Sequence, residues 1–117
     1  MLTEADVRRI ALSMPEAVEA PHFEATSFRV NGKIFCTLGE AGERAVLKFD
    51  PEDQHNLISD DSDVLTPIPG AWGRRGWTQV SFSRLDEARL EGLIRLSWAT
   101  VAPNALVGVQ RRKKRAQ

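Results

Sequence analysis

Residues 25–38, Ala-Thr-Ser-Phe-Arg-Val-Asn-Gly-Lys-Ile-Phe-Cys-Thr-Leu, form the stretch that decides the fold. Two runs rich in β-branched and aromatic residues flank the pair Asn31-Gly32. Asn-Gly favours a type I′ turn, because both turn positions need a positive φ. The stretch therefore predicts a β-hairpin with strands over 25–30 and 33–38, and alternation places Ile34, Cys36 and Leu38 on one side of the second strand.

Outside this hairpin, the two ends of the domain predict helices. Thr3 and Asp6 are spaced for a variant of the capping box, and Pro15 ends the helix that follows. The second helix starts after Ser83 or Asp86 and ends at Pro103. The apolar face of the first helix comprises Val7, Ile10, Ala11 and Met14. The stripe expected to be buried in the second comprises Leu90, Leu93, Ile94, Ser97 and Val101, with Trp98 at its flank.

The middle of the chain predicts three more strands, over 44–49, 64–68 and 77–82, and a short helix from Pro51 to about Ser59. Asp50 and Pro51 are favourable residues for a helix start. Pro67 indicates an edge or a distortion in its strand. The order is α-β-β-β-α-β-β-α. It predicts an α+β fold, a two-layer sandwich with a mostly antiparallel five-stranded sheet and helices on one face.

The bulk composition fits one soluble domain. The chain has 117 residues, of which 42% are hydrophobic, and a single cysteine that excludes an internal disulfide framework. The sequence shows neither a signal peptide nor an apolar run long enough to span a membrane. We expect a cytoplasmic monomer, with one domain over residues 1–106 and a basic, flexible tail over 107–117.

The net charge of zero hides an asymmetry. Residues 1–110 contain 11 of the 16 basic residues and all 16 acidic residues, which gives them a net charge of −5. The tail contains the remaining basic residues, Arg111, Arg112, Lys113, Lys114 and Arg115. A duplex-binding surface needs positive charge to displace counterions, so it has to come from local clustering or from the tail.

The segment Pro69–Trp77 combines three glycines, two tryptophans and two arginines between two expected strands. The glycines permit positive φ and close backbone approach, but their spacing matches no phosphate-binding motif. A hairpin connection held down by packed indoles is favoured over a ligand-binding loop. If the segment is instead a recognition surface, Arg74 and Arg75 offer planar charged groups suited to phosphate or carboxylate.

Catalysis and metal binding find little support. Cys36 and His22 form a conceivable nucleophile pair, but no third group that orients them can be named. Alternation favours a buried, apolar Cys36, and His22 is expected to make structural hydrogen bonds in a turn. No cluster has the spacing of a metal site. We therefore expect no enzyme activity, no cofactor and no metal.

Several segments spread along the chain resemble the sequences of the MmcQ/YjbR-like family. They are Ala11–Pro15, Pro21–Phe23, Ser27–Phe35, Phe49–Pro51, Pro69–Gly73, Gly76-Trp77, Trp98 and Val101–Pro103. The resemblance covers roughly residues 3 to 106. It implies a YjbR-like, secretion-chaperone-like α+β fold and a DNA-binding role in which two β-hairpins project as a double wing. It does not extend to the basic tail.

Duplex DNA is therefore the expected partner, bound at its phosphates by basic residues of the wings and by the tail. The candidate contact residues are Arg29, Lys33, Trp72, Arg74 and Arg75, with Arg111, Arg112, Lys113, Lys114 and Arg115 from the tail. Glu40 and Glu43 border the other wing and oppose this interpretation. The alternative, which the acidic body favours, is a non-catalytic module that binds a protein or a small ligand and has no nucleic-acid role.

Overall fold

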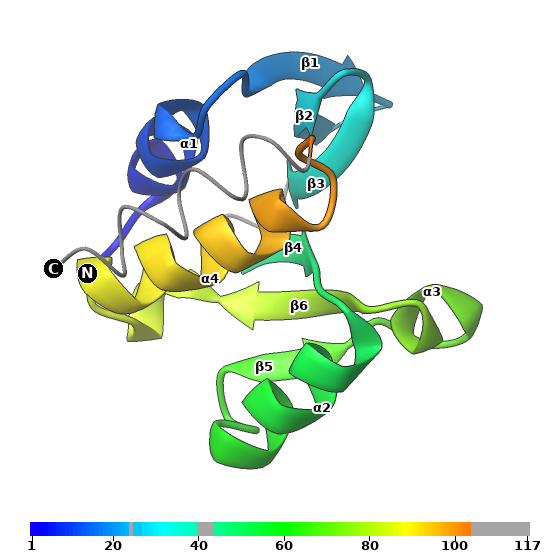
Figure 1. The fold of residues 1–117 in the computed structure, drawn as a ribbon. Helices are drawn as coiled ribbons and strands as arrows, with labels where there is room; N and C mark the ends of the chain where they lie inside the picture. Colours follow the sequence, from blue (N-terminus) through cyan, green and yellow to red (C-terminus); the bar gives the residue numbers. More distant parts are fainter. Residues whose placement is uncertain (24, 40–43, 104–117) are drawn as a thin grey trace, which may run out of the picture.

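The computed structural model describes residues 1–23, 25–39 and 44–103. Their strands form one six-stranded sheet in the order β1-β2-β3-β4-β6-β5, in which every pair of neighbours is antiparallel (Figure 1). The strands are β1 (Val18–His22), β2 (Ala25–Val30), β3 (Lys33–Leu38), β4 (Arg44–Lys48), β5 (Leu65–Pro67) and β6 (Trp77–Ser81). The predicted α+β fold with a mainly antiparallel sheet is confirmed.

The central hairpin forms as its sequence predicts. Asn31 and Gly32 have φ values of 51° and 79°, and Val30 pairs with Lys33 across the turn. One detail differs, because the register shifts where Phe28 and Arg29 face Cys36 and Ile34. The extra residue in β3 turns Ile34 away from the face that carries Cys36 and Leu38, so the prediction of one shared side is wrong for Ile34.

Helices α1 (Glu4–Ser13) and α4 (Glu87–Ala99) pack together over one face of the sheet (Figure 1). The Asp6 carboxylate accepts a 2.8 Å hydrogen bond from the Thr3 backbone N–H, as the predicted capping box requires. This bond lowers the pKa of Asp6, and Arg9 contributes to the same shift. Arg9 binds both Asp6 and Glu87, which joins the two helix starts.

The core lies between these helices and the sheet. Its largest fully buried side chains are Trp98, Phe28, Phe35, Phe49, Phe82, Leu47, Leu65, Leu90, Leu93 and Ile94. Trp98, which was expected beside the stripe of α4, is only 1% exposed and is buried together with it. Its indole N–H donates a 2.9 Å bond to the carbonyl oxygen of Pro15, which makes full burial possible.

Ser97 on α4 connects two strands of the sheet. Its hydroxyl donates a 2.6 Å bond to the carbonyl oxygen of Phe35 on β3 and accepts a 2.9 Å bond from the backbone N–H of Lys48 on β4. The β3–β4 pairing covers only Cys36–Leu38 with Ala45–Leu47. The buried hydroxyl therefore satisfies backbone groups beyond the end of that pairing.

Three short elements lie outside the predicted order: strand β1, helix α3 (Ala71–Arg74) and the 3-10 helix η1 (Phe82–Arg84). The sheet has a sixth strand, β1, whose residues Val18–His22 pair with β2 at one edge, so the expectation of five strands is wrong. His22 therefore ends a strand and does not occupy a turn. At the opposite edge, β5 ends at Pro67, as the proline indicated. Helix α2 (Pro51–Asp60) packs on β5, and α3, which was not predicted, precedes β6.

Candidate functional site

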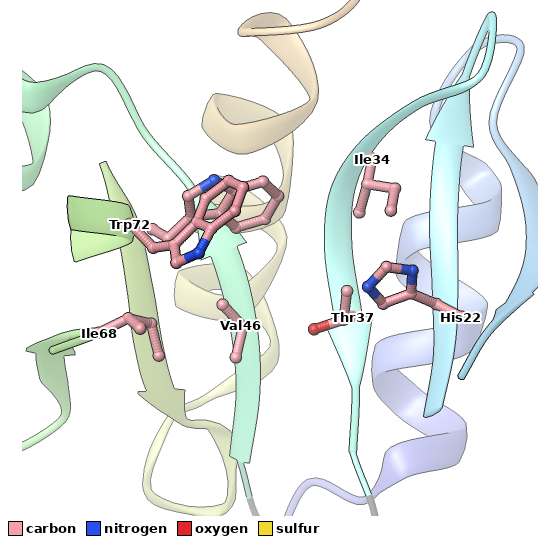
Figure 2. Close-up of a pocket in the computed structure, with 7 residues that line it drawn as sticks. His22, Ile34, Thr37, Val46, Ile68 and Trp72 are labelled. Carbon is pink, nitrogen blue, oxygen red and sulfur yellow. The ribbon is translucent and has the colours of Figure 1, made fainter. Parts of the chain in front are cut away.

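The sheet face opposite α1 and α4 carries the candidate site. Along β4, Ala45 and Leu47 are fully buried, whereas Val46 between them is only partly buried. Val46 pairs with Thr37 on β3 and with Gln79 on β6, which places these residues on the same face. Figure 2 shows Val46 and Thr37 in front of the sheet, with the helices behind it. This surface is called the open face below.

A pocket of about 400 Å³ lies on the open face. It is lined by His22, Ile34, Thr37, Val46, Ile68, Trp72 and Trp77. In Figure 2, His22 and Thr37 lie close together on one side, and Trp72 lies across β4 from them. The lining thus has Trp72 and Ile68 on one side, Val46 in the middle, and Ile34, Thr37 and His22 on the other side (Figure 2). Its volume is that of a small-ligand site.

Two glycines hold α3, and therefore Trp72, at the start of β6. A Cβ atom on Gly73 would lie 1.8 Å from the carbonyl oxygen of Ile68, and one on Gly76 would lie 1.7 Å from that of Phe49. Gly76 also has a φ of 108°. The close approach and positive φ that the glycines permit both occur here, although the segment contains a short helix, α3, that we did not expect.

A buried glutamine completes this support. The side-chain amide of Gln54 in α2 donates to the carbonyl oxygen of Gly73 at 2.9 Å and to the hydroxyl of Thr78 at 3.0 Å. The Thr78 hydroxyl in turn donates to the carbonyl oxygen of Gly76 at 3.0 Å. The connection between β5 and β6 is therefore held by hydrogen bonds as well as by backbone packing, which gives Trp72 a rigid base.

The exposed aromatic group of the pocket is Trp72, with 59% of its surface accessible. Its ring meets that of Trp77 edge-to-face, with centroids 6.5 Å apart and planes at 74°. The guanidinium carbon of Arg75 lies 5.4 Å from the centroid of Trp72. Arg75 thus lies along an indole, the geometry of a cation–π contact.

The other candidate basic residues differ in their contacts. Arg29 donates to the Ser27 hydroxyl at 2.8 Å and to the carbonyl oxygen of Pro21 at 3.0 Å, so part of its guanidinium is engaged within the sheet. Lys33 and Arg74 are exposed, and neither takes part in an ion pair among the described residues. Arg111, Arg112, Lys113, Lys114 and Arg115, as well as Glu40 and Glu43, lie outside the described residues.

The strand register brings several basic positions to one end of the sheet. Lys48 pairs with Trp77 at the start of β6, and α3 immediately precedes this point. Lys33 begins β3, which runs antiparallel to β4 and so lies toward the same end. Lys33, Lys48, Arg74 and Arg75 are called the basic end below.

Catalytic pairing of Cys36 with His22 is excluded by their positions. Cys36 is fully buried on the helix-covered face, whereas His22 lines the pocket on the open face. Burial also raises the pKa of the Cys36 thiol, which disfavours the thiolate needed for nucleophilic attack. Within residues 1–23, 25–39 and 44–103, no group of three or more histidine, cysteine, aspartate or glutamate side chains is placed to hold a metal ion.

The model of the YjbR family matches residues 12–100. The chain belongs to the YjbR family. The fold of this YjbR-family domain is similar to the crystal structure of the Deinococcus radiodurans protein DR2400, which is described by the family domain DUF419, with a TM-score of 0.74 and 21% sequence identity. The alignment covers 97% of this chain and 88% of that one. No curated protein matches the sequence significantly.

The geometry of the YjbR-family domain brings out residues that sequence reasoning missed. Trp72 was a candidate, but His22, Ile34, Thr37, Val46 and Ile68 were not. The available signal was strand alternation, which separates Val46 from its buried neighbours. Among the described residues, no helix is long and apolar enough to cross a lipid bilayer.

Proposed function

We propose that this YjbR-family domain is a non-catalytic DNA-binding protein that contacts phosphates through its basic end. Two connections lie toward this end of the sheet, the β2–β3 turn beside Lys33 and the α3 connection that carries Arg74 and Arg75. These are the two arginine- or lysine-bearing wings, and the basic tail adds a nonspecific electrostatic contribution. Duplex DNA is the partner for which phosphate contacts of this kind suffice.

The observation that carries the proposal is a separation of charge. Strands β2 to β6 and helix α3, all of them described, carry Arg29, Lys33, Arg44, Lys48 and Arg74 and no acidic residue. The acidic side chains of the regular elements are concentrated in the helices, at Glu4, Asp6, Glu52, Asp53, Asp60, Glu87 and Glu91. Strands β2 to β6 and helix α3 are thus basic although the body of the chain is acidic overall. Lys33, Lys48 and Arg74 of this set lie at the basic end, where the exposed Asp50 that follows β4 is the nearest acidic residue in sequence.

The described strands contain one further acidic residue, Glu19 on β1, and its charge is neutralised on the face of the sheet opposite the open face. Glu19 on β1 accepts bonds from Arg8 of α1 at 3.1 Å and from the Thr26 hydroxyl at 2.9 Å. The bond from Arg8 is the main reason that the pKa of Glu19 is lowered. This carboxylate therefore points toward the helix layer and adds no repulsion to a phosphate that approaches the basic end.

The direct test is a titration with duplex DNA at two salt concentrations. Replacing Arg74 and Arg75 with alanine should weaken binding across sequences and reduce the slope of log K against log salt by about 1 for each phosphate that the protein no longer neutralises. The matched control replaces Arg84 and Arg89, two exposed arginines near and on α4, and should leave binding unchanged. Equal decreases in affinity for both double variants would contradict the proposal.

A truncation after Gln110 separates the body from the tail. Retained, salt-sensitive affinity assigns the binding to the sheet, and complete loss assigns it to Arg111–Arg115. The second candidate function is a small-ligand module without a nucleic-acid role, and the apolar pocket of about 400 Å³ is the observation that favours it. Absence of DNA binding in the full chain would leave this candidate.

A further inference from the structure

We propose that the open-face pocket takes an unpaired nucleobase, so that the domain prefers single-stranded nucleic acid over a duplex. The inference rests on the proposed nucleic-acid role and specifies its ligand. It concerns the pocket between Trp72 and His22, which phosphate contacts at the basic end leave unused. Aromatic side chains beside a positively charged surface are the combination that single-strand-binding proteins use.

The chemistry of the pocket fits a base. Its Trp72 side offers an exposed indole, Val46 lies in the middle, and the other side offers the imidazole of His22 and the hydroxyl of Thr37 next to Ile34 (Figure 2). A base has two apolar faces and a polar edge, so it can contact the aromatic and aliphatic groups while its edge bonds to Thr37 or His22. Thr37 and His22 are only half-buried, so their side chains are accessible to such an edge.

The surrounding charge fits the phosphates of the same strand. Lys48 is two residues from Val46 on the open face and pairs with Trp77. Arg44 lies on the same face, where its guanidinium is 3.5 Å from the side-chain oxygen of Gln79. The described part of this face has cations along β4 and no carboxylate from strands β2 to β6, which is complementary to a phosphate backbone running past the pocket.

A duplex cannot fill this pocket without losing a base pair. Its bases are stacked and paired, and only their edges are accessible in the grooves. A single strand exposes its bases at a much lower energetic cost. The pocket therefore adds affinity for a single strand, while the basic end alone contacts a duplex.

The test compares a labelled oligothymidine with its duplex by fluorescence anisotropy, using the full chain. Trp72→Ala removes the exposed indole, and Val46→Phe fills the pocket with a residue suited to a strand. We expect the single strand to bind more tightly than the duplex, and each variant to weaken single-strand binding about tenfold. Val46→Phe, which changes no residue of the basic end, should leave duplex affinity unchanged. Leu12→Ala, an exposed apolar change on α1, is the matched control and should alter neither affinity. Melting temperatures check that the variants are folded.

The remaining outcomes are distinguishable. Equal binding of single strand and duplex, unaffected by Trp72→Ala and Val46→Phe, would overturn the base pocket and leave the proposed function standing. Binding of neither nucleic acid would overturn both. Sedimentation at the same protein concentrations completes the test: a dimer that Trp72→Ala and Val46→Phe dissociate would show that a second copy covers the open face, and would also overturn the base pocket.

Discussion

Gly76 lies so close to Phe49 that a Cβ atom on the glycine would be 1.7 Å from the carbonyl oxygen of Phe49. The two backbones are also joined by a 3.0 Å hydrogen bond from the Phe49 N–H to the Gly76 carbonyl oxygen. This contact fixes the start of β6 against the end of β4. It therefore sets the position of Trp77 and of α3, on which both the basic end and the pocket depend.

Gly76→Ala should destabilise the domain by about 3 kcal/mol or more, because the new methyl group meets backbone and the φ of 108° is strained for alanine. Gly92→Ala is the matched control. Gly92 is inside α4, and a Cβ atom there meets nothing within 4 Å, so the change should stabilise by up to about 1 kcal/mol. Urea unfolding of both variants measures the difference, and equal stabilities would contradict the close approach.

Gly32→Val tests the turn of the central hairpin. The residue has a φ of 79° with open space around its Cα, so any cost comes from backbone strain and not from a clash. We expect a loss of about 1 kcal/mol or more, since a β-branched residue is disfavoured in this region. An unchanged melting temperature would show that the turn does not need its glycine.

Ser97→Ala tests the link between α4 and the two central strands. The change leaves the Phe35 carbonyl and the Lys48 N–H without their buried partner. We expect a loss of about 2 to 3 kcal/mol, in the range for buried groups left unsatisfied. Ser59→Ala is the control, because the Ser59 hydroxyl bonds to the His55 carbonyl at an exposed site and should contribute little. Equal effects of the two changes would refute the assigned role of Ser97.

Cys36 should react slowly with a thiol reagent in the native protein and rapidly after denaturation. The side chain is fully buried, and burial raises the pKa of its thiol, so both access and the thiolate fraction are low. Labelling followed by mass spectrometry at neutral pH gives the two rates. Fast labelling of the folded chain would mean that the helix layer opens readily above β3.

The hairpin over 25–38 could be predicted from sequence because the turn residues and the strand alternation agree there. The first strand, Val18–His22, could not, since it contains Pro21 and Glu19 and forms only by pairing with β2 at the sheet edge. Helix α3 is a single turn that propensity alone does not support. It is held by the close approach of Gly73 to the Ile68 backbone and by the hydrogen bond from Gln54 of α2 to the Gly73 carbonyl oxygen.

The pocket was missed for a similar reason. Its residues come from β1, β3, β4, β6 and α3 together with Ile68, and only the register of the whole sheet brings them together. The bulge at Phe35 moved Ile34 onto the open face against simple alternation. By contrast, Lys33 could be placed beside a turn from the sequence, because Asn31-Gly32 precedes it. The nucleic-acid contacts named for Lys33, Arg74 and Arg75 stay predictions.

The central claim is that the open face and the basic end of the sheet bind nucleic acid. The most direct measurement is a titration of the ¹⁵N-labelled full chain with oligonucleotide, followed by amide and indole NMR shifts. The account predicts shifts in β3, β4, α3 and β6 and at the indoles of Trp72 and Trp77, while the indole of Trp98, bonded to Pro15 in the core, stays unchanged. Shifts confined to α1, α2 and α4, or to the basic tail alone, would contradict it.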